Sequence, residues 1–225
     1  MLILKSMSRS RAPLKHPKQL SLPFRKRGGK RPGAGRPRTH AYPGVIGNLV
    51  PHLRRKGFTS PRAVHVTQRL RPDVGYLRKQ GPAKVVQRAF ADAPDRLGMR
   101  IAHYSIQGSH LHLVVEADDH AALSHGMQGL AVRVARRLNR HLRRRGQVFA
   151  DRFHANVLES RRQVANAVRY VINNYRHHTR EWLPPDFRDE YATHADHPLA
   201  EPKLWLLRVG WRADPVRKTA PSESL

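Results

Sequence analysis

Two β-prone segments separated by a short turn constrain the fold of this chain more than any other feature of its sequence. Residues 100–106 and residues 110–116 are rich in β-branched, aromatic and other apolar side chains, and Gln107-Gly108-Ser109 lies between them. So short a connection predicts an antiparallel hairpin, because the chain has to reverse its direction there. The fold class must therefore accommodate an antiparallel sheet.

The segments on either side of this hairpin predict the rest of an α+β domain. Composition predicts a strand over residues 63–70 and an extended segment over 147–158. Apolar residues at helical spacing predict helices over 84–97, 121–144 and 161–178. The order strand, helix, strand, strand, helix, strand, helix is typical of an α+β fold whose helices pack on one face of an antiparallel sheet.

The charge of the chain indicates a polyanionic partner. Its 225 residues include 43 Lys and Arg against 16 Asp and Glu, a formal net charge of +27. Such an excess attracts nucleic acid through phosphate contacts that weaken with salt. Cysteine is absent, which excludes disulfides, thiolate zinc sites and a cysteine nucleophile. Charge alone fits a binding protein as well as an enzyme.

Composition also divides the chain. Residues 1–60 are rich in Arg, Lys, Pro and Gly, and we expect them to form a flexible, disordered basic arm. Within the arm, Gly35-Arg36-Pro37-Arg38 is similar to an AT-hook, so Arg36 and Arg38 are candidate DNA contacts in a narrow minor groove. Residues 61–181 form the predicted folded domain.

The remaining residues, 182–225, are predicted to be a tail that docks on the domain through Leu204-Trp205-Leu206-Leu207. The apolar run at the start of the chain is too short for a signal peptide or a membrane span. We therefore expect no membrane partner and a cytoplasmic, nucleoid-associated protein.

His110 and His112 are the first candidates for chemistry. Strand side chains alternate, so both imidazoles should lie on one face of the sheet, about 7 Å apart, while Leu111 faces the core. Two neutral imidazoles at this spacing can hold one divalent cation. Taken alone, the pattern more often belongs to two partly exposed histidines, in a chain that has 15 of them.

The last predicted helix carries a polar stripe beside its apolar one. At about 100° per residue, the apolar stripe comprises Val164, Val168, Val171, Ile172 and Tyr175. Tyr170 and Asn174 lie one turn apart on the polar side. The core does not explain a tyrosine there. Its phenol is a candidate nucleophile, and the amide oxygen is a candidate metal ligand.

Together these residues resemble a known family. The ordered set Gly108-Ser109-His110-Leu111-His112-Leu113-Val114 and Tyr170-Val171-Ile172-Asn173-Asn174 is similar to motifs of the single-tyrosine transposases of the HUH endonuclease superfamily. These include the insertion-sequence-200-like and the REP-associated tyrosine transposases. The similarity covers about residues 62–180. Two positions depart from it, since Ser109 stands where many relatives have Asn, and Tyr175 stands where Pro often follows the amide.

The resemblance implies a fold, a reaction and a cofactor. It implies a ferredoxin-like core and the cleavage and joining of single-stranded DNA in DNA transposition and recombination. His110, His112 and Asn174 would hold Mg²⁺ or Mn²⁺, and Tyr170 would attack the scissile phosphate to form a 5′-phosphotyrosine link. The substrate would be single-stranded DNA beside a hairpin, and the protein would act as a monomer or a homodimer.

Arginines indicate where DNA could lie. Arg133, Arg136 and Arg140 are on the helix predicted over 121–144, and Arg152 is in the following extended segment. These four are candidate DNA-binding residues. Arg152 or Arg169 could also favour the phenolate form of the tyrosine.

Three alternatives stay open on sequence alone. A domesticated or inactive descendant would bind DNA hairpins without cutting them. A basic RNA- or ribosome-associated module would carry the histidines and the tyrosine by coincidence. A zinc hydrolase would need a third ligand and a general base, for which Glu116 is a candidate because it shares the strand face of His112.

Overall fold

The structure of the chain is a computed structural model that describes residues 57–179, 182–184 and 186–213. Arg36 and Arg38 of the AT-hook-like segment lie outside the described residues. Among the residues that are described, no helix is both long and apolar enough to cross a membrane.

A five-stranded antiparallel sheet forms the centre of the fold. Its strands are β1 (Arg62–Arg69), β2 (Asp95–Arg96), β3 (Met99–Ile106), β4 (His110–Ala117) and β5 (His154–Leu158), in the spatial order β2-β3-β4-β1-β5. Each neighbouring pair runs antiparallel. The predicted hairpin is present as β3 and β4, and the order β3-β4-β1-β5 is that of a ferredoxin-like sheet.

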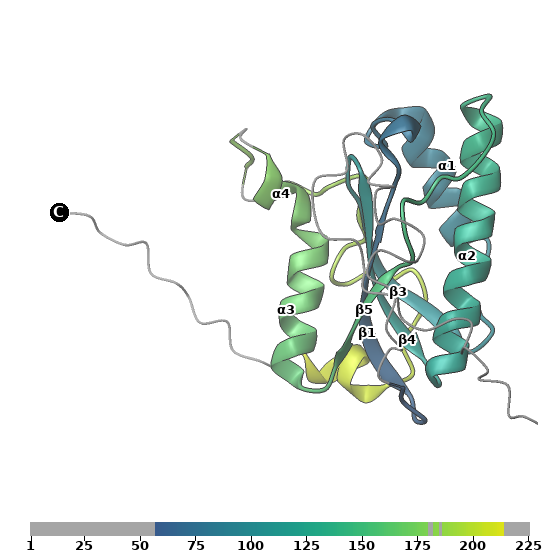
Figure 1. Cartoon of the computed structure of the whole chain (residues 1–225). Helices are drawn as coiled ribbons and strands as arrows, with labels where there is room; N and C mark the ends of the chain where they lie inside the picture. Colours follow the sequence, from purple (N-terminus) through teal and green to yellow (C-terminus); the bar gives the residue numbers. More distant parts are fainter. Residues whose placement is uncertain (1–56, 180–181, 185, 214–225) are drawn as a thin grey trace, which may run out of the picture. The chain divides into compact units, whose positions relative to one another are not determined.

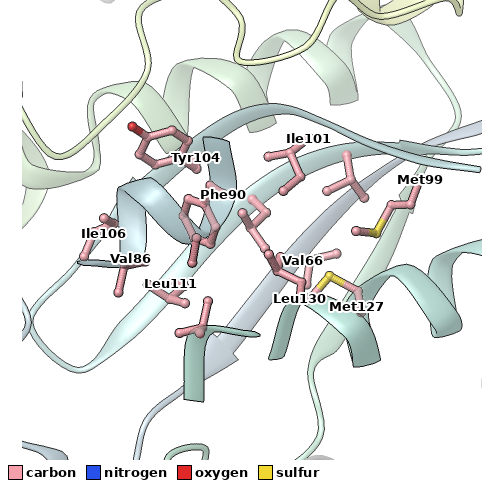
Figure 2. Close-up of a cluster of buried hydrophobic side chains, with 14 of the residues drawn as sticks. Val66, Val86, Phe90, Met99, Ile101, Tyr104, Ile106, Leu111, Met127 and Leu130 are labelled. Atoms are coloured by element: carbon pink, nitrogen blue, oxygen red, sulfur yellow. The ribbon is translucent and has the colours of Figure 1, made fainter. Parts of the chain in front are cut away.

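Two helices cover one face of this sheet, and a third covers the other (Figure 1). Helices α1 (Gln80–Ala91) and α2 (His120–His141) pack against each other and share a core with alternate residues of the strands. Figure 2 shows this core, in which Val66, Ile101 and Leu111 of the sheet meet Phe90 of α1 and Met127 of α2.

Helix α3 (Arg161–Ile172) lies on the opposite face. The expected α+β class with an antiparallel sheet is confirmed, but the placement of helices on one face holds only for α1 and α2. The reason is that the second face of the sheet carries apolar side chains beside its polar ones. Ala102 and Val114 point away from the first core and form a second one with Val164 and Val168 of α3.

The helix predicted over residues 161–178 is interrupted near its end. Ser160 and Gln163 form a reciprocal capping box that begins α3. The helix ends at Ile172, and a short helix α4 (Asn174–His178) follows after Asn173. Asn174 therefore begins a new helix, and its direction does not follow from the periodicity of α3.

The C-terminal segment runs back along β3. The backbone N–H of Thr193 donates to the carbonyl of Tyr104 at 3.0 Å, and that of Leu199 donates to Ala102 at 2.8 Å. A short π-helix, η2 (Leu206–Gly210), follows, and its Leu207 is buried in the second core.

Glu116 joins this segment to the sheet. Its side chain is 1% exposed and accepts hydrogen bonds from the Arg100 guanidinium and from the backbone N–H groups of Lys203 and Leu204, each at 2.8 Å. A carboxylate occupied in this way does not act as a general base beside the histidines. The zinc-hydrolase alternative therefore loses its candidate base.

We expect Glu116→Gln to lower the free energy of unfolding by about 3 kcal/mol, because it removes the charge that compensates a buried guanidinium. Chemical denaturation measures this. The control is Asp118→Asn, which alters another partner of Arg100, at 3.3 Å, whose side chain is 51% exposed. Its effect should stay below about 1 kcal/mol. Equal losses in the two variants would contradict the assigned role of burial.

Candidate functional site

Polar side chains meet at the middle of the sheet on the face that α3 covers. In the β1–β4 pairing, Thr67 lies opposite His112. Nδ1 of His112 is 3.2 Å from the hydroxyl of Thr67 and 3.3 Å from Nε2 of His65. Val64 and Val66 point to the other face, into the first core. Strand alternation thus places His65 and Thr67 beside His112.

His110 lies next to His112 on the same strand face. Their ring centroids are 4.7 Å apart, and Nδ1 of His110 is 3.3 Å from the hydroxyl of Ser109. Nδ1 is therefore engaged in both imidazoles. Nε2 of His112 is buried and has no hydrogen-bond partner among the described residues. Because a hydroxyl can accept a hydrogen bond, these contacts accommodate the tautomer with its proton on Nδ1, which leaves Nε2 free to act as a ligand atom.

Helix α3 brings Tyr170 to this pair. The tyrosine ring centroid is 5.2 Å from that of His112 and 5.9 Å from that of His65, and it meets both edge to face. On its other side the ring stacks with His177 at 6.3 Å. The side chain is 37% exposed. Tyr170 therefore contacts the buried histidines while its surface stays open to a substrate.

Asn174 is a buried amide just beyond the end of α3. It is fully buried at the start of α4, and neither its oxygen nor its nitrogen has a hydrogen-bond partner in the described part of the chain. An unsatisfied buried amide costs about 1–3 kcal/mol of stability. Such a group has the chemistry of a ligand donor.

Burial keeps the histidines neutral. It lowers the pKa of His112 to about 3, with smaller contributions from His110, His65 and His178. Burial also lowers the pKa of His110, with help from Arg69 and His178. Burial and then His154 lower the pKa of His65. At neutral pH these imidazoles therefore have a lone pair available.

The donor set fits a hard or borderline divalent cation. Two neutral imidazoles and an amide oxygen without another partner are ligands that such ions accept. Within residues 57–213, as far as these are described, there is no group of three or more His, Cys, Asp or Glu side chains that could hold a metal. The fit therefore rests on the mixed set of His110, His112 and Asn174.

The assignment of Tyr175 to the core is wrong. This residue is half-buried and belongs to neither core cluster. The guanidinium of Arg78 lies 3.8 Å from its ring centroid, and Phe187 is 6.0 Å away. The helical wheel assumed one continuous helix, whereas the interruption at Asn173 redirects the residues that follow.

The predicted DNA-binding arginines do not gather around Tyr170. Arg133, Arg136 and Arg140 lie on α2, on the far side of the sheet from α3 (Figure 1). They line a pocket of about 410 Å³ together with Arg96 and Arg137. Arg152 lies half-buried in the segment that leads into β5.

Sequence reasoning missed several histidines and one hydroxyl that surround the site, namely His65, Thr67, His154, His177 and His178. The alternation of Val64, His65, Val66 and Thr67 was a usable signal. It places His65 and Thr67 on one face of β1. The alternation does not predict the strand register that brings this face beside His112.

The family model described as "Transposase IS200 like" matches residues 62–174, half of the chain, and this range includes β1, the histidine pair, Tyr170 and Asn174. No curated protein matches the chain.

Two solved structures are similar. A REP-associated tyrosine transposase bound to a REP hairpin is 12% identical, with a TM-score of 0.44, over 66% of this chain and 97% of that one. A candidate transposase from Deinococcus radiodurans R1 is 14% identical, with a TM-score of 0.39, over 48% of this chain and 86% of that one.

Proposed function

The chain belongs to the IS200-like transposase family, and we propose that it cuts and rejoins single-stranded DNA through a covalent link to Tyr170. Family membership makes it a DNA-cleaving transposase. The nucleophile, the metal and the form of the substrate are our proposal. The observation that carries it is the contact of a partly exposed tyrosine with a buried, neutral histidine whose Nε2 is free.

His110, His112 and Asn174 are the residues that would hold the cation. A bound Mg²⁺ or Mn²⁺ polarises the phosphate that it contacts. The hydroxyls of Ser109 and Thr67 orient the two rings through Nδ1. Burial excludes protons that would compete for Nε2, since the pKa of His112 is far below neutrality.

Tyr170 is the proposed nucleophile. Its phenolic oxygen forms a bond to phosphorus while the bond from phosphorus to the 3′ oxygen breaks, so the 5′ end stays on the protein and the 3′ oxygen leaves as a hydroxyl. The phenolic proton has to be removed, because the ordinary pKa of tyrosine is about 10. Arg69 lies close enough to His110 to lower the pKa of that imidazole, so it adds positive charge beside the histidine pair.

The reverse reaction joins DNA. A 3′-hydroxyl attacks the phosphotyrosine, and the phenol leaves as it regains a proton. One phosphodiester bond replaces another, so rejoining needs no external energy source. The same residues therefore serve cleavage and strand transfer.

We further propose that the arginine-lined pocket on α2 binds DNA phosphates away from the cut. The arginines form a dense cationic surface, which suits a duplex stem such as a hairpin. Arg133 and Arg137 are tied to α1 through the carbonyl of Ala89 and the carboxylate of Asp92. Arg136 and Arg140 line the same pocket and are the more accessible to test.

We expect Tyr170→Phe to abolish the covalent protein–DNA adduct while folding and hairpin binding persist. The change removes only the attacking oxygen. Incubation with Mn²⁺ and hairpin-bearing single strands, followed by denaturing electrophoresis, measures the adduct. Tyr175→Phe is the matched control and should still form it. An adduct that survives Tyr170→Phe and disappears in Tyr175→Phe would reverse the assignment, and no adduct in the wild type would favour a binding protein without cleavage.

We expect Thr67→Val to weaken Mn²⁺ binding by about 10-fold or more, because groups that orient a ligating histidine typically contribute 10–100-fold to metal affinity. Isothermal titration of the full chain measures this. Thr67→Ser keeps the hydroxyl and should retain near-normal affinity. If the valine variant binds Mn²⁺ as tightly as the wild type, the hydroxyl does not position His112.

We expect the double variant Arg136→Ala, Arg140→Ala to bind hairpin DNA more weakly and with a shallower salt dependence. Each lost phosphate contact should reduce the slope of log K against log salt by about 0.7–0.9. Arg208→Ala, which removes an exposed charge from η2, is the control. An unchanged slope in the double variant would remove α2 from the DNA-binding surface.

A further inference from the structure

A second pocket lies directly beside the candidate site. It has a volume of about 520 Å³ and lies between the segment that follows β1 and the turn that precedes β4. Its lining includes Arg71, Tyr76, Gly108, Ser109, His110 and His178. Because His110 belongs both to this lining and to the candidate metal site, an occupant of the pocket would be a near neighbour of the reacting phosphate.

Tyr76 provides the aromatic surface of the pocket. It is 55% exposed, although the ring is held in place on one side. That side lies over the backbone of Gly108, where an added Cβ would come within 2.2 Å of a ring carbon. Glycine therefore acts as a flat support for the ring. The exposed remainder of the ring is a surface on which a planar group can stack.

The backbone keeps this platform rigid relative to the histidines. The N–H of Leu77 donates to the carbonyl of Gly108, and the N–H of Leu70 donates to the carbonyl of Ser109, both at 2.8 Å. Gly75, with a φ of 83°, allows the left-handed turn that presents Tyr76. The platform and His110 are thus attached to the same turn.

Two arginines line the pocket, and each is paired with a carboxylate. Arg78 lines it and is held by a bidentate ion pair with Asp189, at 2.9 and 3.0 Å. Arg71 lines it as well, paired with Asp73. The arginines therefore hold the walls of the pocket in place, and the exposed ring of Tyr76 is the feature that suits single-stranded nucleic acid, because any base has a planar face that can stack on it.

We propose that this pocket receives an unpaired DNA base next to the scissile phosphate, stacked on Tyr76. The position of the base relative to the cut rests on the function proposed above. The stacking of a base on Tyr76 does not rest on that function, since it follows from the exposed ring and its support on Gly108. The pocket thus positions the strand so that the adjoining phosphate lies at His110.

The test uses the full chain with Tyr170→Phe, so that no covalent chemistry interferes. A 12-nucleotide oligothymidine carrying one 5-iododeoxyuridine is bound and irradiated, and the crosslinked peptide is identified by mass spectrometry. We expect the main crosslink at Tyr76. Tyr76→Ala should lower affinity for this oligonucleotide about 5-fold or more, the equivalent of one lost stacking contact. Tyr76→Phe should retain it.

Two further variants separate stacking from general effects. Gly108→Ala displaces the Tyr76 ring without removing it and should also reduce the crosslink, with circular dichroism verifying the fold. Trp182→Ala removes an aromatic ring that is 83% exposed and lies outside the pocket, and it should leave the crosslink unchanged. Normal affinity and an undiminished total crosslink in Tyr76→Ala would overturn the proposal.

Adduct formation by the wild type is measured in parallel and tells the two proposals apart. If Tyr76→Ala gives as much adduct as the wild type at limiting DNA, the base pocket is contradicted and the proposed cleavage is not. A crosslink at Tyr76 without any adduct supports the base pocket and contradicts the proposed cleavage.

Discussion

The antiparallel pairing of β1 with β4 is the constraint on which the rest of the site depends. Its register sets Thr67 opposite His112 and brings His65 into contact with the same ring. Strand side chains alternate, so a slip of one residue would turn His65 and Thr67 into the core and Val64 and Val66 out of it. The free-energy penalty of exposing those two valines therefore disfavours a shifted register and keeps His65 and Thr67 beside His112.

Helix α3 both covers an apolar part of the sheet and carries residues of the site. The second face of the sheet carries Ala102 and Val114 beside its polar residues, which lets α3 pack opposite α1 and α2 and still reach the polar middle of the sheet with Tyr170. The helix then breaks at Asn173, and Asn174 is buried with its amide unsatisfied by the described residues. Unsatisfied buried groups lower stability and are concentrated at functional sites. This arrangement is consistent with a ligand donor kept ready for a cation.

Local patterns were enough to predict the hairpin, the histidine pair and the polar position of Tyr170, because alternation and helical period are properties of single elements. They could not predict what depends on contacts between elements. Thr67 contacts His112 only because of the register between β1 and β4. Tyr175 lies outside the core because α3 ends at Ile172, before this residue. The platform of Tyr76 arises from backbone hydrogen bonds to a turn some thirty residues later in the sequence, for which periodicity has no signal.

The central claim is that Tyr170 carries the DNA strand. Peptide mapping of the wild-type adduct by tandem mass spectrometry tests it directly, after incubation with Mn²⁺ and a hairpin-bearing single strand. Trypsin cuts after Arg169 and Arg176, so one peptide contains both Tyr170 and Tyr175, and fragmentation between them locates the modification. The account predicts a phosphonucleotide on Tyr170. A phosphonucleotide on Tyr175, or on any residue outside this peptide, would contradict it.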